Sequence, residues 1–434
     1  MTRQPSRIGV LGAGSLGLTV AYRLAQQGFS VTVIERERQP GGLAAGFPVG
    51  NTHLEKFYHH LFRTDREIIA LIQELGLGKE LLWLRPKTSV LLGGRTYQLD
   101  SATSVLRFSP LGLPDRLRLG AAIAYLKARP NHHGLERVTA HSWIRRWMGR
   151  STYEKVWQPL LQSKFGARYP DITMSWFWAR VHDRTPSLGY LRGSFQRLYD
   201  CLAAEVQQRG GTVRLEEAVS EIAPTPDGSI TITTPRGEEH YDVVVATLPS
   251  RVVVRLTRGL PDDFRCRYDW GEAYGAHCLI LSLDHQLMPE TYWLNVNDPG
   301  YPFLAAVEHT NMMPPSEYGG RRLVYLGNYL PMDHPLFAKS EEEILAEFLP
   351  HLKRINPSFD PGWVKEYWDF KAPYAQPIIT AEYADHIPPH RTPIPNLYLA
   401  NMFQVYPHDR GQNYSVALAN EVAGMVLADH SPGH

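Results

Sequence analysis

A glycine-rich turn between an apolar strand and a helix lies close to the start of the chain, and few folds accommodate it. Residues 7–11 form a short apolar run, Gly12, Gly14 and Gly17 follow, and apolar residues then recur at helical spacing as far as Gly28. A second run, residues 29–34, is rich in β-branched residues and ends at Glu35. We therefore predict a βαβ unit over residues 7–35 and an α/β fold around a parallel sheet.

The spacing of these glycines indicates a dinucleotide site. Gly12 permits the tight turn, Gly14 lets the backbone approach a pyrophosphate, and Gly17 lets the helix pack against the strand. The Glu35 carboxylate can accept hydrogen bonds from ribose hydroxyls, and its charge disfavours the 2′-phosphate of NADP. A second pair, Gly41 and Gly42, would let the next loop fold back on the same diphosphate, which favours FAD over NAD. The expected contacts are Gly12, Gly14, Ser15, Leu16, Gly17, Glu35, Arg36, Gly41, Gly42 and Leu43.

Composition excludes several other classes of protein. The 434 residues allow a large core and more than one domain, and 45 basic against 44 acidic side chains provide no field for nucleic acid. Three cysteines without metal-ligand spacing predict neither a disulfide framework nor a metal site, and they favour a reducing, cytoplasmic compartment. No segment approaches the ~18–20 apolar residues of a membrane helix. The basic and apolar residues of 106–126 fit a packed helix or a membrane-surface patch, and we favour the packed helix.

The remainder of the chain alternates helical and strand patterns. Helices are expected at 67–77, through most of 113–178, and at 193–208, 341–355 and 411–427. Strands are expected at 212–215, 230–234, 241–246, 278–283, 322–327 and 396–400, with a hairpin at 90–99 and a proline-rich loop at 373–395. Tryptophans concentrate in residues 143–178, where core packing is a simpler explanation than a cavity lining.

The stretch GAGSLGLTVAYRLAQQGFSVTVIERERQPGGL resembles the N-terminal signature of the flavin-containing amine oxidase superfamily, which includes protoporphyrinogen oxidases and carotenoid desaturases. The resemblance implies a Rossmann-like FAD domain of the glutathione-reductase-like kind with an inserted α+β substrate domain. The FAD domain would comprise residues 1–80, 190–260 and 375–434, and the substrate domain 81–189 and 261–374. Later matches imply contacts of the Val219 backbone with adenine and of the last helix with the flavin. They add Val219, Met402, Asn413, Tyr414 and Ser415 to the expected FAD-binding residues.

The chain also departs from the family pattern. Ala400 is followed by Asn401 and Met402, where members carry Gly and a nearby acidic residue. The C-terminal stretch holds no cysteine, so FAD is expected to be non-covalent. The lysine that many amine oxidases place near flavin N5 has no secure counterpart, and Lys371 is only a speculative substitute. Leu43 stands where many members have Arg, as on the protoporphyrinogen-oxidase and desaturase side.

Two segments supply the catalytic candidates. Residues 53–60 pass where the family's chain runs beside the flavin ring, and His59, Glu55 and Tyr58 are the candidates there, because histidine transfers protons near neutral pH. Tyr406, before the last helix, is the fourth candidate, in a group with His408, Asp409 and Arg410. Structural roles for the histidines and an exposed charged loop for the second group are the competing explanations.

These observations predict an FAD-dependent oxidoreductase that transfers hydride from an apolar, aromatic or amine substrate to flavin N5, with an unknown electron acceptor. Alternatives are a non-redox flavin-dependent mutase or isomerase, a cofactor-free lipid-chaperone protein of the same fold, and an NAD dehydrogenase. Gly12, Gly14, Gly17, Glu35 and the Gly41–Gly42 pair together argue against the chaperone, and the second glycine pair argues against the NAD dehydrogenase.

Overall fold

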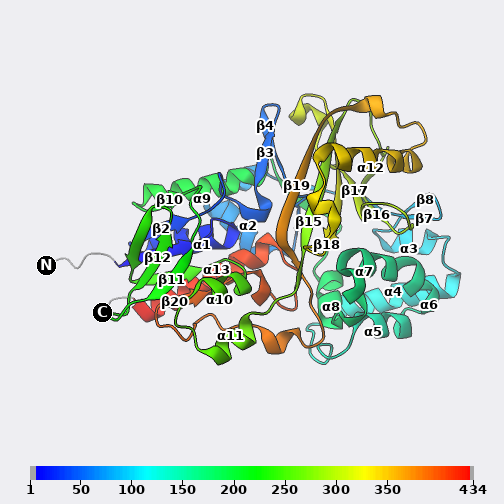
Figure 1. Ribbon diagram of the computed structural model, residues 1–434. Coiled ribbons are helices and arrows are strands. Elements are labelled where there is room, and N and C mark those ends of the chain that lie inside the picture. Colours follow the sequence, from blue (N-terminus) through cyan, green and yellow to red (C-terminus); the bar gives the residue numbers. More distant parts are fainter. Residues whose placement is uncertain (1–5, 431–434) are drawn as a thin grey trace.

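A five-stranded parallel sheet at one end of the molecule carries the glycine-rich turn (Figure 1). The computed structural model describes residues 6–430. The predicted βαβ unit is confirmed, with helix α1 (Ser15–Gln26) between two neighbouring parallel strands. Strands from the start, middle and end of the chain share the sheet, in the order β10 (Thr212–Arg214), β2 (Ser30–Ile34), β1 (Arg7–Leu11), β14 (Val243–Ala246) and β20 (Leu397–Leu399).

The two faces of this sheet have different covers, because strand side chains alternate between them. On one face, Val10 and Val33 pack in a core with α1, α2 (Arg66–Glu74), α9 (Gln196–Gln208) and α13 (Gln412–His430). On the other, Leu11 and Ile34 pack in a second core. Its other members come from an antiparallel sheet of β11 (Glu221–Pro224), β12 (Ile230–Thr234) and β13 (Gly237–Tyr241), and from α10 (Ser250–Leu256) and α11 (Asp262–Tyr268). The predicted strand at 241–246 is thus divided between β13 and β14.

Helix α9 begins three residues later than the apolar period indicates. Gly193 and Ser194 have φ values of 80° and 82°, so the chain passes through the left-handed region before the helix starts. Ser194 accepts this conformation while its hydroxyl donates to the buried carboxylate of Glu55 at 2.8 Å. A tertiary contact therefore sets the first turn of α9.

A seven-stranded, mainly antiparallel sheet forms the next layer of the molecule (Figure 1). Its order is β19 (Val364–Pro377), β15 (Ala273–Leu283), β18 (Arg322–Leu330), β17 (Ala305–Glu308), β16 (Thr291–Val296), β7 (Lys87–Leu92) and β8 (Arg95–Gln98). The predicted 90–99 hairpin is β7 and β8, whereas the predicted loop at 373–395 is wrong over its first five residues. Strand β19 lies at the sheet edge, where Pro373 and Pro377 cost few ladder hydrogen bonds.

Helices cover this sheet and extend beyond it. Helix α12 (Glu341–Ile355) has the predicted bounds, because Ser340 and Glu343 form a reciprocal capping box at its start. The predicted helical stretch at 113–178 is confirmed as a separate cluster around a third core. Helix α3 (Ala102–Arg107) precedes this stretch. The helices within it are α4 (Leu113–Ala128), α5 (Ala140–Trp147), α6 (Arg150–Thr152), α7 (Gln158–Phe165) and α8 (Met174–His182).

Two small sheets connect these layers. One pairs β3 (Gly46–Val49) with β4 (Thr52–Glu55), and the other places β9 (Leu188–Leu191) between β5 (Leu61–Phe62) and β6 (Leu81–Leu84). The segment between β4 and β5 contains His59 and passes between the parallel sheet and the seven-stranded sheet. Across residues 6–430, no helix has both the length and the apolar character required to span a bilayer.

Candidate functional site

The first turn of the chain requires glycine at two positions for steric reasons. Gly12 has φ of 106°, its N–H donates to the Ile34 carbonyl at 2.8 Å, and a Cβ there would lie 2.6 Å from Thr247 Oγ1. A Cβ on Gly17 would lie 2.0 Å from the Gly12 carbonyl oxygen, closer than any real Cβ contact. These two glycines therefore bring α1 close against β1, and the helix N-terminus with its positive dipole end points over the turn.

Gly14 differs, because a Cβ there would meet no atom within 4 Å. The second glycine pair folds back beside it: the Gly41 N–H donates to the Ala13 carbonyl at 2.8 Å, and a Cβ on Gly42 would lie 3.3 Å from Gly14 Cα. The buried Ser15 hydroxyl in the first turn of α1 has no hydrogen-bond partner within the described chain. An open backbone cradle with an unpartnered hydroxyl and helix amides fits a diphosphate.

The acidic residue at the end of β2 is held in place by backbone groups. Glu35 Oε2 accepts from the Ala13 N–H at 2.7 Å, and Oε1 accepts from the Glu37 N–H at 2.9 Å. Each carboxylate oxygen retains a further lone pair for a ribose hydroxyl. Val219 lies half-buried between β10 and β11, on the side of the antiparallel sheet, while Arg36 is exposed and pairs with Glu37.

The beginning of α13 contributes differently from residue to residue. Gly411 to Tyr414 line a cavity whose wall also includes the seven-stranded sheet, α7 and α8, but the Asn413 side chain caps α2, accepting from the Glu67 and Ile68 N–H groups at 3.0 and 3.2 Å. The Tyr414 hydroxyl donates to Asp183 at 2.8 Å, and the Ser415 hydroxyl donates to the carbonyl of Gly411, the residue directly before the helix. Met402 lies in a short 3₁₀ turn, Met402–Gln404, outside the cavity wall.

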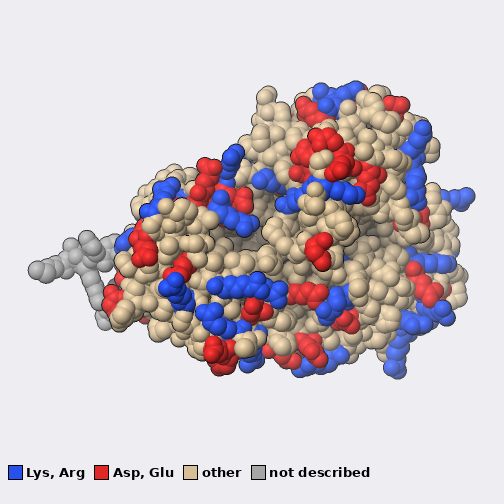
Figure 2. All heavy atoms as spheres, in the orientation of Figure 1, with Lys and Arg blue, Asp and Glu red and all other residues tan. Residues whose placement is uncertain are grey.

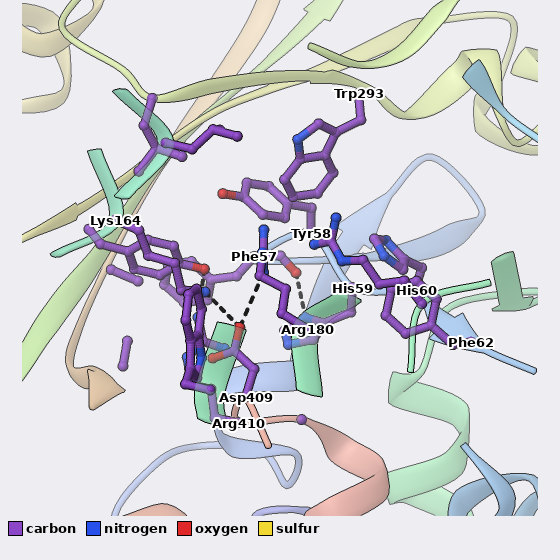
Figure 3. Close-up of a pocket in the computed structure, with 18 of the residues that line it drawn as sticks. Phe57, Tyr58, His59, His60, Phe62, Lys164, Arg180, Trp293, Asp409 and Arg410 are labelled. Atoms are coloured by element: carbon purple, nitrogen blue, oxygen red, sulfur yellow. Dashed lines mark hydrogen bonds and ion pairs between the residues drawn. The ribbon is translucent and has the colours of Figure 1, made fainter. Parts of the chain in front are cut away.

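The cavity that meets α13 has a volume of about 230 Å³ and a wall rich in aromatic side chains (Figure 3). Leu43, directly after the second glycine pair, belongs to the same wall, so the cavity continues from the dinucleotide cradle. Tyr58 packs edge-on against Trp293 with ring centroids 4.7 Å apart. The Phe, Tyr and Trp members are Phe57, Tyr58, Phe62, Trp157, Trp176, Phe177, Trp293, Tyr329 and Tyr414.

Three cations gather near the Asp409 carboxylate in one part of this wall, which also contains Arg184, Asp65 and Asp183. Asp409 Oδ2 lies 2.7 Å from Lys164 Nζ and 3.3 Å from an Arg180 guanidinium nitrogen, as Figure 3 shows. Arg410 donates to the Tyr329 hydroxyl at 2.6 Å. The expectation of an exposed charged loop at 408–410 is therefore wrong for Asp409 and Arg410, which are half-buried in the cavity wall.

Burial controls the protonation of this cluster. Desolvation lowers the pKa of Lys164 from its ordinary value to about 7, although Asp409 opposes that change. Burial alone would raise the pKa of Asp409, but the charges of Lys164, Arg180 and Arg410 outweigh it and lower the pKa. Asp409 is therefore an anion at neutral pH, and Lys164 can gain or lose a proton there.

His59 lies in the same wall, and its ring is oriented by the backbone. Its Nδ1–H donates to the Phe57 carbonyl at 2.7 Å, which leaves Nε2 as an acceptor (Figure 3). Burial, and then the Arg410 charge, lower the pKa of His59 to about 4, so the ring is neutral at pH 7. Burial raises the pKa of Tyr58 well above its ordinary range, so this phenol stays protonated.

Glu55, expected beside His59, lies in a buried hydrogen-bond network instead. Its carboxylate accepts from the Tyr190 hydroxyl, the Ser194 hydroxyl and the Phe195 N–H at 2.7 to 2.8 Å. Burial raises the pKa of Glu55, and these three donors oppose the change. These hydrogen bonds connect β4 to β9 and to the start of α9, so we assign the Glu55 carboxylate a structural role.

We expect a Glu55→Gln variant to lose stability rather than chemistry. One amide nitrogen would face hydroxyl and N–H donors, leaving buried donors without acceptors, at a cost of about 2–4 kcal/mol in the free energy of unfolding. Urea unfolding measures this loss, and turnover per bound flavin should remain near wild type. A turnover loss above about 100-fold with unchanged stability would return Glu55 to the catalytic group.

The structure does not bring Tyr406 or Lys371 to the cavity wall. The Tyr406 ring stacks on Tyr383 at 6.1 Å and packs edge-on against His132. Lys371 lies 3.3 Å from Asp369 and donates to the Lys339 carbonyl, on the side of the seven-stranded sheet that faces α12. His132 lies close to His133 and Glu136 in a partly exposed turn, to which we assign no metal.

Sequence reasoning missed Lys164 and Arg180, because α7 and α8 carry no motif around them. The usable signal was the tryptophan density of residues 143–178. Trp157 and Trp176 do line the cavity, whereas Trp147 is exposed, so neither the core nor the cavity interpretation covers the whole segment. Cys278 also lies in this wall, and burial raises the pKa of its thiol well above the ordinary value. Non-covalent attachment of the cofactor stays a prediction.

A profile of the flavin-containing amine oxidoreductases matches residues 17–408. A solved protein from Exiguobacterium sp. 255-15, named a protoporphyrinogen oxidase, superimposes with a TM-score of 0.78 at 19% identity, covering 98% of this chain and 99% of the other. Reduced UDP-galactopyranose mutase gives 0.77 at 16% identity, with 98% and 96% covered.

The curated sequences that match this chain align with it over only part of their length. The carotenoid phi-ring synthase of Streptomyces griseus is 24% identical over 296 residues, which are 60% of this chain and 56% of that protein. The chain spans little more than half, or less, of the length of the curated relatives it matches. The predicted fold class, a Rossmann-like FAD domain with a substrate domain, is confirmed.

Proposed function

Since this chain belongs to the flavin-containing amine oxidoreductase family and FAD is its cofactor, we propose that it dehydrogenates an apolar or aromatic substrate in the aromatic cavity. Gly14, Ser15 and the Gly41–Gly42 loop would hold the diphosphate, and Glu35 the ribose. The amides at the start of α13 would face the flavin. We propose that residues 1–80, 190–260 and 375–434 form the FAD domain.

The observation that carries this proposal is the composition of the cavity wall. Aromatic rings exclude water and pack against flat or apolar groups. Lys164, Arg180, Arg184 and Arg410 share this wall with Asp65, Asp183 and Asp409, so the cavity has no excess of negative charge to attract a protonated amine. The wall therefore favours dehydrogenation of a C–C bond over dehydrogenation of the C–N bond of an amine, and the carotenoid named in one relative supports an apolar substrate.

The dehydrogenation removes one hydrogen as hydride and one as a proton. When bound, FAD accepts the hydride at N5. The proton of the adjacent C–H bond needs a base, and we assign that role to the neutral Lys164 amine, whose pKa of about 7 suits proton transfer at neutral pH. The electron pair of that C–H bond becomes the new double bond of the product.

His59 and Tyr58 would position the substrate rather than accept the proton. A pKa of about 4 makes His59 a weak base, but its fixed Nε2 can accept a hydrogen bond from the substrate. The Tyr58 ring, held edge-on by Trp293, forms a flat wall against which an aromatic or polyene group can stack.

Anaerobic titration of the purified protein with candidate substrates tests the proposal. The protein should be yellow, and one equivalent of the true, still saturated substrate should bleach one equivalent of flavin while one product double bond forms. A phenazine or quinone dye then measures turnover without assuming the natural electron acceptor. Bleaching by a simple amine, but by no apolar substrate, would contradict the proposed substrate class.

A non-redox mutase or isomerase is the second candidate, favoured by the similarity of the fold to UDP-galactopyranose mutase over nearly the whole chain. Such an enzyme would act only after chemical reduction of its flavin and would consume no net electrons. A colourless protein that cannot be reconstituted with FAD would instead favour the chaperone or NAD alternative.

A further inference from the structure

Large exposed apolar side chains gather on one part of the surface. Six such side chains exist within residues 6–430, and five lie on or beside α3, α4 and α5, while the sixth is Met332. The five, here called the α3–α5 face, are Leu106, Leu113, Leu117, Tyr125 and Trp147, each 50 to 59% exposed. Scattered exposed apolar residues are ordinary, but this concentration indicates a contact surface.

Helix α4 shows the feature most clearly, because both of its sides are apolar. Leu119, Ala122 and Leu126 are buried against the helical core. The side that faces solvent carries Leu113, Leu117, Ala121 and Ala124, at the spacing of successive turns. A surface helix normally turns polar residues outward, so the expectation that residues 106–126 form simply a packed helix accounts for only one side.

Aromatic rings continue this surface from α4 to α5. The Tyr125 ring stacks on Trp143 with centroids 6.4 Å apart at an interplanar angle of 17°, and Trp143 lies 6.3 Å from Trp147. Tyr125 also accepts a hydrogen bond from Arg129, and Arg146 lies over the Trp147 ring. Tyrosine and tryptophan beside cationic side chains are typical of the boundary between water and the lipid acyl region.

Charge is strongly asymmetric here, although the chain as a whole is nearly neutral. Residues 101–150 contain nine Lys and Arg against two Asp and Glu, while the whole chain has a net charge of +1. At the edge of the molecule that carries α4 to α6 in Figure 1, Lys and Arg outnumber Asp and Glu among the charged side chains visible in Figure 2. Arg107, Arg118 and Arg145 are exposed around the apolar side chains.

We propose that the α3–α5 face docks this protein on the surface of an anionic lipid bilayer, with Leu113 and Leu117 inserted at the acyl boundary and the surrounding Arg and Lys on the headgroups. Exposed leucines and aromatic rings provide apolar burial, and the cations provide attraction to acidic lipid. A second copy of the chain is a poorer occupant. A two-fold contact would place this strongly basic segment against itself.

Vesicle flotation tests the proposal with the full-length, flavin-loaded protein. Phosphatidylcholine vesicles with and without phosphatidylglycerol are the two surfaces. The wild type should bind the anionic vesicles at least about tenfold more tightly than the neutral ones, and raising the salt to about 1 M should weaken that binding. Failure of the wild type to bind anionic vesicles would overturn the proposal.

Two pairs of variants separate the apolar from the charged contribution. Leu113→Gln/Leu117→Gln should weaken binding by about tenfold or more, whereas Met332→Gln, the exposed apolar residue elsewhere, should not. Arg107→Gln/Arg145→Gln should weaken binding to anionic vesicles by about tenfold, whereas Lys79→Gln/Lys353→Gln, exposed lysines elsewhere, should not.

Flavin content and the thermal midpoint of each variant show that the fold is intact. These variants lie outside the cavity and the dinucleotide cradle, so the docking result stands whether or not the proposed reaction is correct. Wild-type binding by the leucine variant would overturn the proposal. Sedimentation gives a second possible contradiction. If the wild type is a dimer and the leucine substitutions convert it to a monomer, the α3–α5 face is a protein interface and the proposal is wrong.

Discussion

A Gly17→Ala variant should be recovered without flavin and should unfold at markedly lower urea concentration than the wild type. Its new Cβ would lie 2.0 Å from the Gly12 carbonyl oxygen, and that atom is backbone, so α1 must move away from β1. We expect a loss of about 1–3 kcal/mol in the free energy of unfolding, as for overpacked cores. The ratio of visible flavin to protein absorbance measures the loss of cofactor.

Gly14→Ala separates cofactor binding from folding. Its Cβ meets open space in the protein, so the stability of the flavin-free form should stay within about 1 kcal/mol of wild type. The methyl group would nevertheless occupy the cradle where the diphosphate approaches. We expect FAD affinity to fall by about 100-fold, or ~2.7 kcal/mol, in titrations of the flavin-free protein.

Gly424→Ala is the matched control for both substitutions. This glycine lies on the exposed side of α13, its φ is not positive, and a Cβ there would meet nothing within 4 Å. Flavin content should be unchanged, and stability should rise by about 0.5–1 kcal/mol because alanine favours helix. Full flavin binding by Gly14→Ala would contradict the cradle as the diphosphate site.

Lys164→Met should reduce turnover by about 10²- to 10⁴-fold while the protein still binds FAD, since it removes the proposed proton acceptor. Asp409 keeps Arg180 as a partner at 3.3 Å, so its carboxylate is not left alone in the cavity. The neutral amine is the active form, and its pKa is about 7. Wild-type turnover should therefore rise with pH through about 7, and the variant should lose that dependence.

Lys371→Met is the control, because Lys371 pairs with Asp369 outside the cavity wall. Turnover per bound flavin should stay near wild type, even if the free energy of unfolding falls. If the turnover of Lys164→Met still rises with pH through 7, a group other than Lys164 accepts the substrate proton. His59→Gln tests the positioning role of that ring and should raise KM more than it lowers kcat.

The dinucleotide half of the site was predictable because its determinants are local. Gly12 and Gly17 act through backbone conformation and close packing, and the Glu35 carboxylate accepts a hydrogen bond from the Ala13 N–H in the same βαβ unit, so the structure brings all three to one turn as the spacing predicts. The Gly41–Gly42 loop lies against Gly14, again as expected. Whether these residues contact FAD in this protein stays a prediction.

The cavity half was not predictable, because its members are far apart in sequence. Lys164 comes from α7, Arg180 from α8 and Asp409 from the segment before α13, and periodicity gives no information about contacts between separate elements. For Glu55, closeness in sequence was misleading. It lies four residues before His59, but its carboxylate accepts hydrogen bonds from Ser194 and Phe195 in the core instead of contacting that histidine. Lys371 likewise lies away from the cavity wall, where it pairs with Asp369 of the same strand and donates to the Lys339 carbonyl.

The sequence alone determined the parallel sheet, the glycine turn and the class of cofactor, because steric limits on backbone and the alternation of apolar residues act over a few residues. The tertiary structure decided which charges share the cavity and which apolar side chains of α4 remain outside. Both depend on burial, and burial follows from packing between segments that are distant in the chain.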